Sequence, residues 1–279
     1  MKIRKILNNN SAVVLDDDNQ EVVVIGKAIA FKKKIGDAIN PAVIEKKFCL
    51  SSQSLNTKFQ EVIVCLPLEE ISLVTKIIDE IKMRIGKKIS DSIYVSLSDH
   101  IHFALKNYEK GIHITNNLMY DIQRFYPDEY KLGLIGLDII EKETGVRLNI
   151  DEAGFIALHF VNSEYDTSIS DAAKFPTEIH KILDLIHHEF KLKVDEKSLN
   201  YERLLTHVKF LLQRVYRNEM LKDEDLLIIQ TIKRQCEKEF DCCRKISSSI
   251  KEATGKELTE AEMVYMAIHI RRLLNTNKE

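Results

Sequence analysis

The stretch Glu152-Ala-Gly-Phe155-Ile156-Ala157-Leu158-His159-Phe160 occurs a second time, as Glu262-Met-Val-Tyr265-Met266-Ala267-Ile268-His269-Ile270. The two copies share a glutamate, an aromatic residue, an alanine and a histidine in register. Their separation, from His159 to His269, is the length of a small domain. A repeat of this length indicates a duplicated domain rather than the short unit of a solenoid.

A second histidine precedes each copy at a similar distance. The interval from His100 to His159 is nearly the same as the interval from His207 to His269. Histidine changes charge near neutral pH and can carry a metal or a transferable phosphoryl group. Two retained pairs therefore indicate a function rather than packing alone.

Composition favours a helical protein with well-formed cores. Of the 279 residues, 44% are apolar and 30% charged, and only 9 are glycine and 4 proline. The length suggests two or three domains. Apolar runs are much shorter than a membrane-spanning helix requires. The N-terminus, Met1–Ile6, lacks the features of a signal peptide, so a cytoplasmic protein is expected.

The five cysteines predict neither a zinc site nor a disulfide framework. Their number is odd and no pair has C-x-x-C spacing, so we expect reduced, packed thiols.

The overall charge of −2 is unevenly distributed, since the N-terminal residues 1–56 hold nine Lys/Arg and six Asp/Glu and are therefore basic. A basic head on an acidic body suggests a polyanionic partner.

Strand patterns fill the N-terminal segment, and helical patterns follow. The expected strands, separated by turn residues, are Lys2–Leu7, Ala12–Leu15, Glu21–Ile25 and Glu45–Leu50. They form a small antiparallel sheet with one apolar face, which we expect to need a partner copy for stability.

Helices are expected from Pro67 onward, in two similar sets. Asp151 can cap the helix that bears His159, and Thr259-x-x-Glu262 has the capping-box pattern before His269. One long helix is expected around Asp223–Lys251, and a linker at Ser163–Ala173. The predicted fold is a small antiparallel β domain at 1–56, followed by all-α helical bundles at 57–170 and 171–279.

Several chemistries can use paired histidines. A metal site at Asp99, His100 and His102 is one possibility, but Asp99 and His102 have no counterpart in the second copy, where Thr206 and Lys209 stand. The sequence contains no nucleophile elbow, phosphate loop or paired-carboxylate motif. Phosphoryl acceptance agrees better with two repeated pairs, because the added charge can bias a dimer interface.

The chain resembles BglG/LicT-type transcriptional antiterminators over essentially its full length. The resemblance rests on five segments in order: Lys5–Asn10, Val24–Lys33, Asn56–Phe59, Ser90–His100 and Asp151–His159. It implies an N-terminal co-antiterminator RNA-binding domain followed by two regulation domains of the sugar phosphotransferase system. Such proteins dimerise through the small sheet and hold a leader-RNA hairpin, which prevents termination of a sugar-utilisation operon.

The resemblance also implies roles for individual residues. Lys5, Asn10, Gly26, Lys27 and Phe31 match RNA-contacting positions, with Phe31 stacking on a base. Lys27 stands where many relatives have arginine, and Ala28 where glycine is common; both departures can alter RNA preference.

All four family phosphohistidines are present, as His100, His159, His207 and His269. The resemblance implies that the inducing sugar's permease phosphorylates the first regulatory domain and inactivates the protein. The phosphocarrier protein HPr phosphorylates the second domain when preferred sugars are scarce, and this activates the protein. Three arginines near the second pair in sequence are candidate phosphate partners: Arg203, Arg271 and Arg272.

No enzymatic activity, cofactor, bound metal or membrane insertion is expected. A DNA-binding activator with the same regulatory domains is the alternative, but it requires a helix-turn-helix where the sequence predicts strands. A metal-dependent hydrolase using Asp99, His100 and His102 is a third hypothesis.

Overall fold

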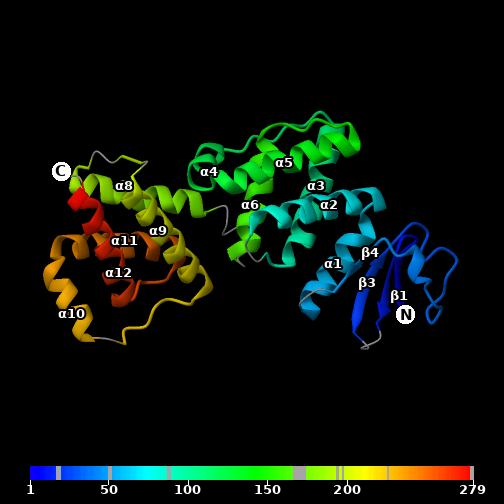
Figure 1. Cartoon of the computed structure of the whole chain (residues 1–279), viewed down its shortest axis with the longest axis horizontal. Helices are drawn as coiled ribbons and strands as arrows, with labels where there is room; N and C mark the ends of the chain where they lie inside the picture. Colours follow the sequence, from blue (N-terminus) through cyan, green and yellow to red (C-terminus); the bar gives the residue numbers. More distant parts are fainter. Residues whose placement is uncertain are drawn as a thin grey trace. The chain divides into compact units, whose positions relative to one another are not determined.

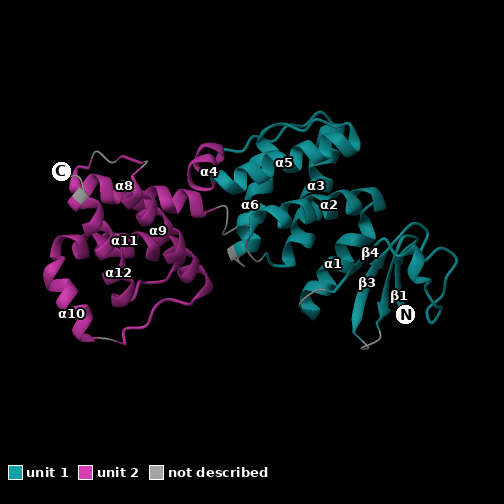
Figure 2. Cartoon of the chain, in the orientation of Figure 1, with its two compact units in different colours: residues 1–117, 127–166 teal, residues 118–126, 167–279 magenta. Residues whose placement is uncertain are grey.

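The computed structural model describes residues 1–16, 20–49, 52–86, 89–165, 174–192, 195–196, 198–224 and 226–276 (Figure 1). The chain divides into two compact units (Figure 2). Unit 1 comprises residues 1–117 and 127–166, and unit 2 comprises residues 118–126 and 167–279. The predicted domain boundary at 170/171 lies outside the described residues. Residues 118–126, within the predicted range 57–170, group with unit 2.

Unit 1 begins with an antiparallel sheet in the order β1-β2-β3-β4, which confirms the predicted fold class. Its strands are β1 (Lys2–Asn8), β2 (Ser11–Leu15), β3 (Glu21–Ile25) and β4 (Lys46–Phe48). The first three begin and end within a residue of the predicted strands, because short runs rich in Val and Ile between Asn- and Asp-rich turns define them. The fourth is shorter than predicted. Residues 17–19, in the turn predicted after β2, lie outside the described residues.

The sheet is apolar on both faces, so the expectation of a single apolar face is wrong. Val22 and Val24 pack with Ile29 and Ile39 of the connection between β3 and β4, which contains the short 3-10 helix η1 (Pro41–Val43). Val13, Val23, Ile25 and Phe48 join the core of the following helices instead. The second face is therefore covered by helices of this chain.

The helices of unit 1 are α1 (Gln53–Cys65), α2 (Leu68–Ile85), α3 (Ser92–Glu109), α5 (Pro127–Thr144) and α6 (Asp151–Tyr165). Ser52 caps α1 by accepting a hydrogen bond from the Leu55 amide, and Gly86 ends α2 in the left-handed conformation. Helices α5 and α6 approach closely at Gly133, where an added Cβ would lie 2.0 Å from the carbonyl oxygen of Ala153. This contact fixes the position of α6, which carries His159.

Unit 2 contains α4 (Met119–Phe125), α8 (Phe175–Phe190), α9 (Leu199–Arg217), α10 (Leu226–Gln235), α11 (Glu237–Thr254) and α12 (Glu260–Thr276). The single helix expected around Asp223–Lys251 is in fact α10 and α11, interrupted at Cys236, where φ is −121° and ψ is 43°. The predicted linker at Ser163–Ala173 begins later than expected, because α6 continues through Tyr165. No helix in the described part of the chain is long and apolar enough to cross a membrane.

The turn after β3 contains a non-glycine residue in left-handed conformation. Ala28 has φ = 54°, the region that glycine occupies at little cost. Its amide donates a 2.8 Å hydrogen bond to Oδ1 of Asn10, and the Ala30 amide donates to the Asn9 carbonyl. The turn between β1 and β2 thus holds this strained backbone in place.

Replacing Ala28 by glycine removes the cost of the left-handed Cβ. We expect Ala28→Gly to raise the free energy of unfolding by about 0.5–1 kcal/mol. Ala42→Gly is the matched control, because Ala42 has no positive φ and glycine there should be neutral or destabilising. Urea denaturation followed by circular dichroism measures both, and a destabilised Ala28→Gly protein would contradict the assignment of strain.

Candidate functional site

The first histidine pair joins two neighbouring helices of unit 1. His100 lies on α3 and His159 on α6, and their ring centroids are 4.8 Å apart with the planes inclined by 42°. Phe155, one turn before His159, lies 5.7 Å from the His100 ring. The predicted pairing of histidines distant in sequence is thus present as direct ring contact.

A buried carboxylate engages the first pair. Nε2 of His100 donates to Oε2 of Glu152 at 2.9 Å, and the two side chains are only 16% and 11% exposed. A carboxylate can only accept, so this contact places a proton on Nε2 of His100. A phosphoryl group can occupy Nε2 only after Glu152 has moved away.

His159 is almost completely buried, and its Nδ1 has no hydrogen-bond partner among the described residues. Burial lowers the pKa of His159 well below its usual value, and neighbouring His100 lowers it further. The ring is therefore neutral at pH 7 and keeps a lone pair that can attack phosphorus.

The second histidine pair comes from the other copy of the repeat, and its two rings lie closer together than those of the first pair. His207 on α9 and His269 on α12 are stacked, with ring centroids 3.4 Å apart and planes inclined by 25°. Tyr265, the counterpart of Phe155, lies 5.2 Å from each ring. The duplicated helices therefore bring both predicted pairs together.

The glutamate of the second copy does not contact the histidines. Glu262 is 1% exposed, and Arg214 on α9 donates to both of its oxygens at 2.6 Å, from Nε and Nη2. The Leu221 amide adds a third hydrogen bond at 2.9 Å. The predicted capping box is consequently half-formed: the Glu262 amide donates to Oγ1 of Thr259 at 3.3 Å, while the carboxylate bonds Arg214.

Positive charge surrounds the second pair. Burial lowers the pKa of His269 to about 4, with further lowering by His207, Arg272 and Arg203. The pKa of His207 is lowered by burial and then by Arg214 and Arg272. Both rings are thus neutral at pH 7, and arginines lie near them.

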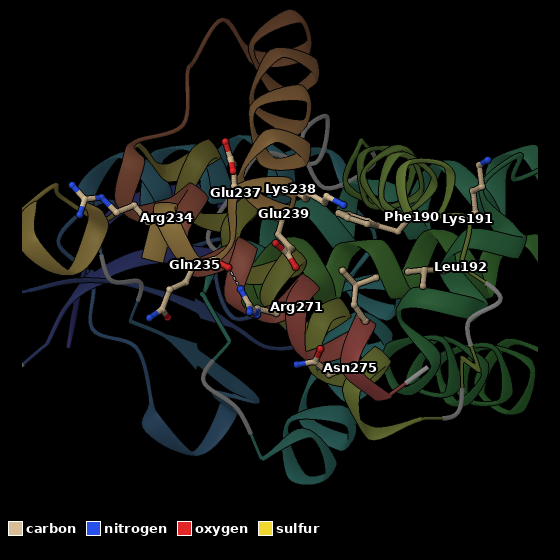
Figure 3. Close-up of a pocket in the computed structure, with 11 residues that line it drawn as sticks. Phe190, Lys191, Leu192, Arg234, Gln235, Glu237, Lys238, Glu239, Arg271 and Asn275 are labelled. Carbon is tan, nitrogen blue, oxygen red and sulfur yellow. Dashed lines mark hydrogen bonds between the residues drawn. The ribbon is translucent and has the colours of Figure 1, made fainter. Parts of the chain in front are cut away.

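Of the three arginines predicted as phosphate partners, two belong to this site. Arg203 and Arg272 lie one helical turn from His207 and His269 respectively. Arg271 points elsewhere: its Nη1 donates to the Gln235 carbonyl and lies 3.2 Å from Sγ of Cys236. Figure 3 shows Arg271 in a separate pocket of unit 2, lined also by Arg234 and Glu237.

Three of the five predicted RNA-binding residues surround one turn of the sheet domain, and Phe31 follows it closely. Asn10 holds the Ala28 amide, and its own carbonyl accepts from the Gly26 amide at 3.0 Å. Lys27 is exposed, and Phe31 is 52% exposed with the Lys32 ammonium 5.3 Å from its ring centroid. An exposed aromatic ring beside lysines has the chemistry needed to stack on a base.

Asn10 and Gly26 also have structural roles within the sheet domain. A Cβ on Gly26 would lie 2.1 Å from the Val43 carbonyl oxygen, so backbone packing alone requires glycine there. Asn10 is needed to hold the left-handed turn at Ala28. Their RNA contacts remain predictions, as do those of Lys27 and Phe31.

Lys5 lies apart from this group. It pairs with Val13, a residue of the core shared with the helices, and its ammonium donates to Oε1 of Gln60 on α1 at 3.1 Å. Asn8 also reaches α1, donating to the Ile63 carbonyl at 3.1 Å. The candidate RNA-binding lysine of β1 is thus engaged by the first helix after the sheet.

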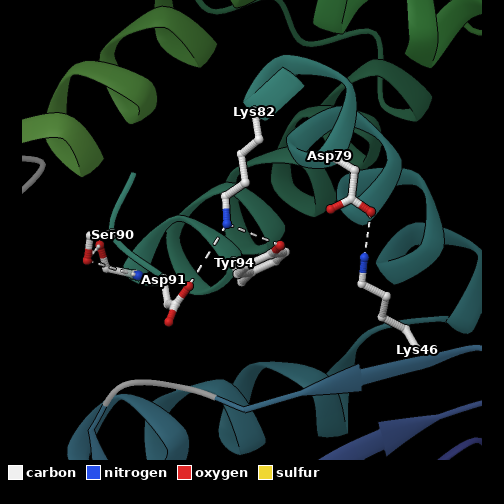
Figure 4. Close-up of polar contacts among 7 residues, drawn as sticks. Lys46, Asp79, Lys82, Ser90, Asp91 and Tyr94 are labelled. Atoms are coloured by element: carbon white, nitrogen blue, oxygen red, sulfur yellow. Dashed lines mark hydrogen bonds and ion pairs between the residues drawn. The ribbon is translucent and has the colours of Figure 1, made fainter. Parts of the chain in front are cut away.

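Aromatic rings connect the sheet to the helices that carry the first histidine pair. Phe48 of β4 lies 4.8 Å from Phe59 of α1 and 5.2 Å from Tyr94 of α3, between ring centroids. Lys46 bonds Asp79 at 2.5 Å, and Lys82 lies against Tyr94 and Asp91 (Figure 4). Burial, followed by Asp79 and Asp91, raises the pKa of Tyr94 to about 12.

The proposed metal ligands do not converge. His100 bonds Glu152, whereas His102 bonds a different carboxylate, Glu70, at 2.6 Å through Nδ1. Within the described ranges, no group of three potential ligands could hold a metal ion. Burial raises the pKa of the Cys242 thiol to about 12, typical of a packed, unreactive cysteine.

Two functional candidates were missed as site residues in the sequence, namely Glu152 and Glu262. Both belong to the repeated motif, so their presence in both copies was visible. The sequence did not show which residues they contact, because their partners lie on other helices, 52 and 48 residues away.

Removing Arg214 leaves the Glu262 carboxylate buried without its cation. We expect Arg214→Asn, which introduces the residue found at the matching position of the first copy, to destabilise unit 2 by about 3 kcal/mol. Arg244→Asn is the control, because Arg244 and Asp241 form an exposed pair at 3.0 Å. Such a pair should contribute less than about 1 kcal/mol. Urea unfolding curves compare the two, and equal shifts would contradict the importance of the buried pair.

The lowered pKa of His269 predicts a pH-dependent stability. In the unfolded chain this histidine binds a proton below about pH 6.5, whereas in the folded protein it does so only near 4. Stability is therefore fully present above pH 6.5 and is lost as the pH falls toward 4, by roughly 3 kcal/mol from this residue. Unfolding curves at pH 7.5 and 5 should differ less for His269→Asn, while exposed His188→Asn should retain the wild-type difference.

Comparison with known proteins identifies the domains. Residues 1–57 match the CAT RNA binding domain, and residues 75–163 and 180–273 each match the PRD domain. The crystal structure of GlcT CAT-PRDI superimposes with a TM-score of 0.51 at 30% identity, covering 58% of this chain and 97% of that one.

Full-length relatives have the same organisation. The transcription antiterminator LicT of Bacillus subtilis is 38% identical over 274 residues, covering 98% of this chain and 99% of LicT. The beta-glucoside operon antiterminator of Dickeya chrysanthemi is 37% identical over 279 residues, covering 100% and 99% of the two chains. The chain therefore belongs to the family of transcription antiterminators in which a CAT RNA-binding domain precedes two PRD domains.

Proposed function

We propose that this protein is an RNA-binding antiterminator, which stabilises a leader-RNA hairpin and so prevents termination of a sugar-utilisation operon. The observation that carries the proposal is the joint presence, in one chain, of the CAT domain and of two PRD domains that each hold a contacting histidine pair. The exposed Phe31 ring and the lysines around it supply base stacking and phosphate contacts.

Control of RNA binding falls to the histidine pairs. The phosphocarrier protein HPr phosphorylates the second pair and activates the protein, and a sugar-specific permease phosphorylates the first pair and inactivates it. The active form is a cytoplasmic homodimer that presents two CAT sheets to one hairpin. Neutral imidazoles support this scheme, because an unprotonated nitrogen is the nucleophile that phosphoryl transfer needs.

Phosphorylation acts in this scheme by shifting a population of dimers. Moving it from 1:99 to 99:1 requires about 5.5 kcal/mol of differential stabilisation. Charge-assisted contacts of one phosphoryl group with arginine are worth a few kcal/mol per site, and a dimer contains two such sites.

A DNA-binding activator is the weaker alternative. It requires a recognition helix in the N-terminal domain, whereas residues 1–16 and 20–49 contain β-strands and one short 3-10 helix.

The proposal is tested with full-length protein and the leader hairpin of the neighbouring sugar operon. Gel-shift titration should show selective binding over a scrambled hairpin, and in vitro transcription should show readthrough of the terminator. Phe31→Ala should weaken binding about tenfold, since stacking on one base contributes about 1–3 kcal/mol. Phe103→Ala is the matched control, because Phe103 is 53% exposed on α3, outside the CAT domain. Equal affinity for the scramble, or unchanged binding by Phe31→Ala, would refute the proposal.

A further inference from the structure

The two histidine pairs lie on faces with the same backbone register but different charges. On α9, Arg203 lies four residues before His207 and Arg214 seven after it; on α12, Glu262 lies seven before His269 and Arg272 three after it. These spacings place all of them on the helix faces that meet at the histidines. The same spacings identify their counterparts on α3 and α6.

Every arginine of the second face is replaced by a neutral residue in the first. Ser96 stands for Arg203, Asn107 for Arg214 and Asn162 for Arg272. Only the glutamate is retained, as Glu152. Leaving the histidines aside, these aligned positions sum to a charge of +2 in the second copy and −1 in the first.

The glutamates are also disposed differently. Glu262 is held by both nitrogens of the Arg214 fork and turned away from the imidazoles. Glu152, with no arginine at the matching position, bonds Nε2 of His100 directly. The first pair thus has a carboxylate bonded to one of its imidazoles, whereas the second pair has exposed arginines one helical turn away.

We propose that the second pair is a phosphate-retaining site, in which Arg203 and Arg272 hold the phosphoryl oxygens, and that the first pair is a phosphate-releasing site, in which Glu152 opposes the phosphoryl group. This inference rests on the proposed function in one respect, that the histidines accept phosphoryl groups. A phosphoryl group carries about −1.5 to −2 charges, so it neutralises the second face and adds repulsion to the first. Burial lowers the pKa of His207 and of His269, and the neighbouring arginines lower both further.

The bond changes explain why the charges alter lifetime. On phosphorylation, an imidazole lone pair forms an N–P bond while the bond from phosphorus to the donor's leaving group breaks. On hydrolysis, a water oxygen bonds phosphorus, the N–P bond breaks, and its electron pair returns to the ring, which takes up a proton. Arginines stabilise the anionic phosphoryl group and disfavour protonation of the ring, whereas a carboxylate favours departure of a protonated ring. Release is therefore slower from the second pair.

The experiment uses two full-length proteins that each keep one pair, H100N/H159N and H207N/H269N. Each is phosphorylated with potassium phosphoramidate, whose P–N bond breaks with release of ammonia, so no protein donor is required. After removal of the reagent at pH 7.5, phosphorus NMR follows the loss of phosphohistidine. We expect the second pair to retain phosphate at least about threefold longer, the size expected for exposed charge contacts.

Substitutions then test the assigned residues. In the protein that keeps the second pair, R203Q/R272Q should shorten the lifetime toward that of the first pair, and R272K should give an intermediate value. R271Q is the matched control, because the Arg271 guanidinium is held at Gln235 and Cys236. In the protein that keeps the first pair, E152Q should lengthen the lifetime. Thermal unfolding confirms that each variant is folded.

Equal lifetimes of the two pairs, or lifetimes unaffected by R203Q/R272Q and E152Q, would overturn this inference and leave the proposed antitermination intact. Failure of both pairs to accept phosphate from phosphoramidate and from HPr would overturn the phosphorylation scheme and this inference together. Failure of RNA binding alone would refute the proposed function while the lifetime difference still stood.

Discussion

A buried carboxylate near the start of α6 and of α12 must receive hydrogen bonds, and the rest of the candidate site depends on which groups donate them. Transfer of an ionised carboxylate from water into a protein interior costs several kcal/mol unless a cation or several donors meet it. In the second copy Arg214 meets Glu262, and in the first copy His100 meets Glu152. The glutamate that both copies retain is thus bonded to an arginine in the second copy and to a histidine of the pair in the first.

The same helix that bears His100 also contacts the RNA-binding sheet. Tyr94 lies six residues before His100 on α3, and its ring packs against Phe48 of β4. Helix α1, between sheet and bundle, contributes Phe59 to this cluster and Gln60 to the hydrogen bond with Lys5. The sheet face that lies toward the helices is therefore part of the core of the first PRD domain. Helix α3 thus carries His100 and packs on β4, while α1, in the same aromatic cluster, bonds the strand that carries a candidate RNA contact.

The sequence was sufficient to predict most strands and helices and the two histidine pairs. Short runs rich in Val and Ile, the turn residues between them and the repeated motif are all visible in it. Features that depend on partners distant in sequence were not. The break at Cys236 lies within an apolar pattern typical of one helix, and the burial of the sheet's second face depends on Phe59 and Ile63 of α1. The selection of Arg272 over its neighbour Arg271 required the helix face to be known, because adjacent residues on a helix point about 100° apart.

In the proposed scheme, the charge difference between the two copies explains how histidine phosphorylation can activate the protein at one pair and inactivate it at the other. A phosphoryl group on the second pair brings a face of charge +2 close to neutrality, so that two such faces can approach each other at little electrostatic cost. The same group beside Glu152 makes a face of charge −1 strongly negative, and two such faces repel. Since both copies match the PRD domain, the sign of regulation need not come from the fold. Three positions, occupied by Arg203, Arg214 and Arg272 in one copy and by Ser96, Asn107 and Asn162 in the other, are enough to set it.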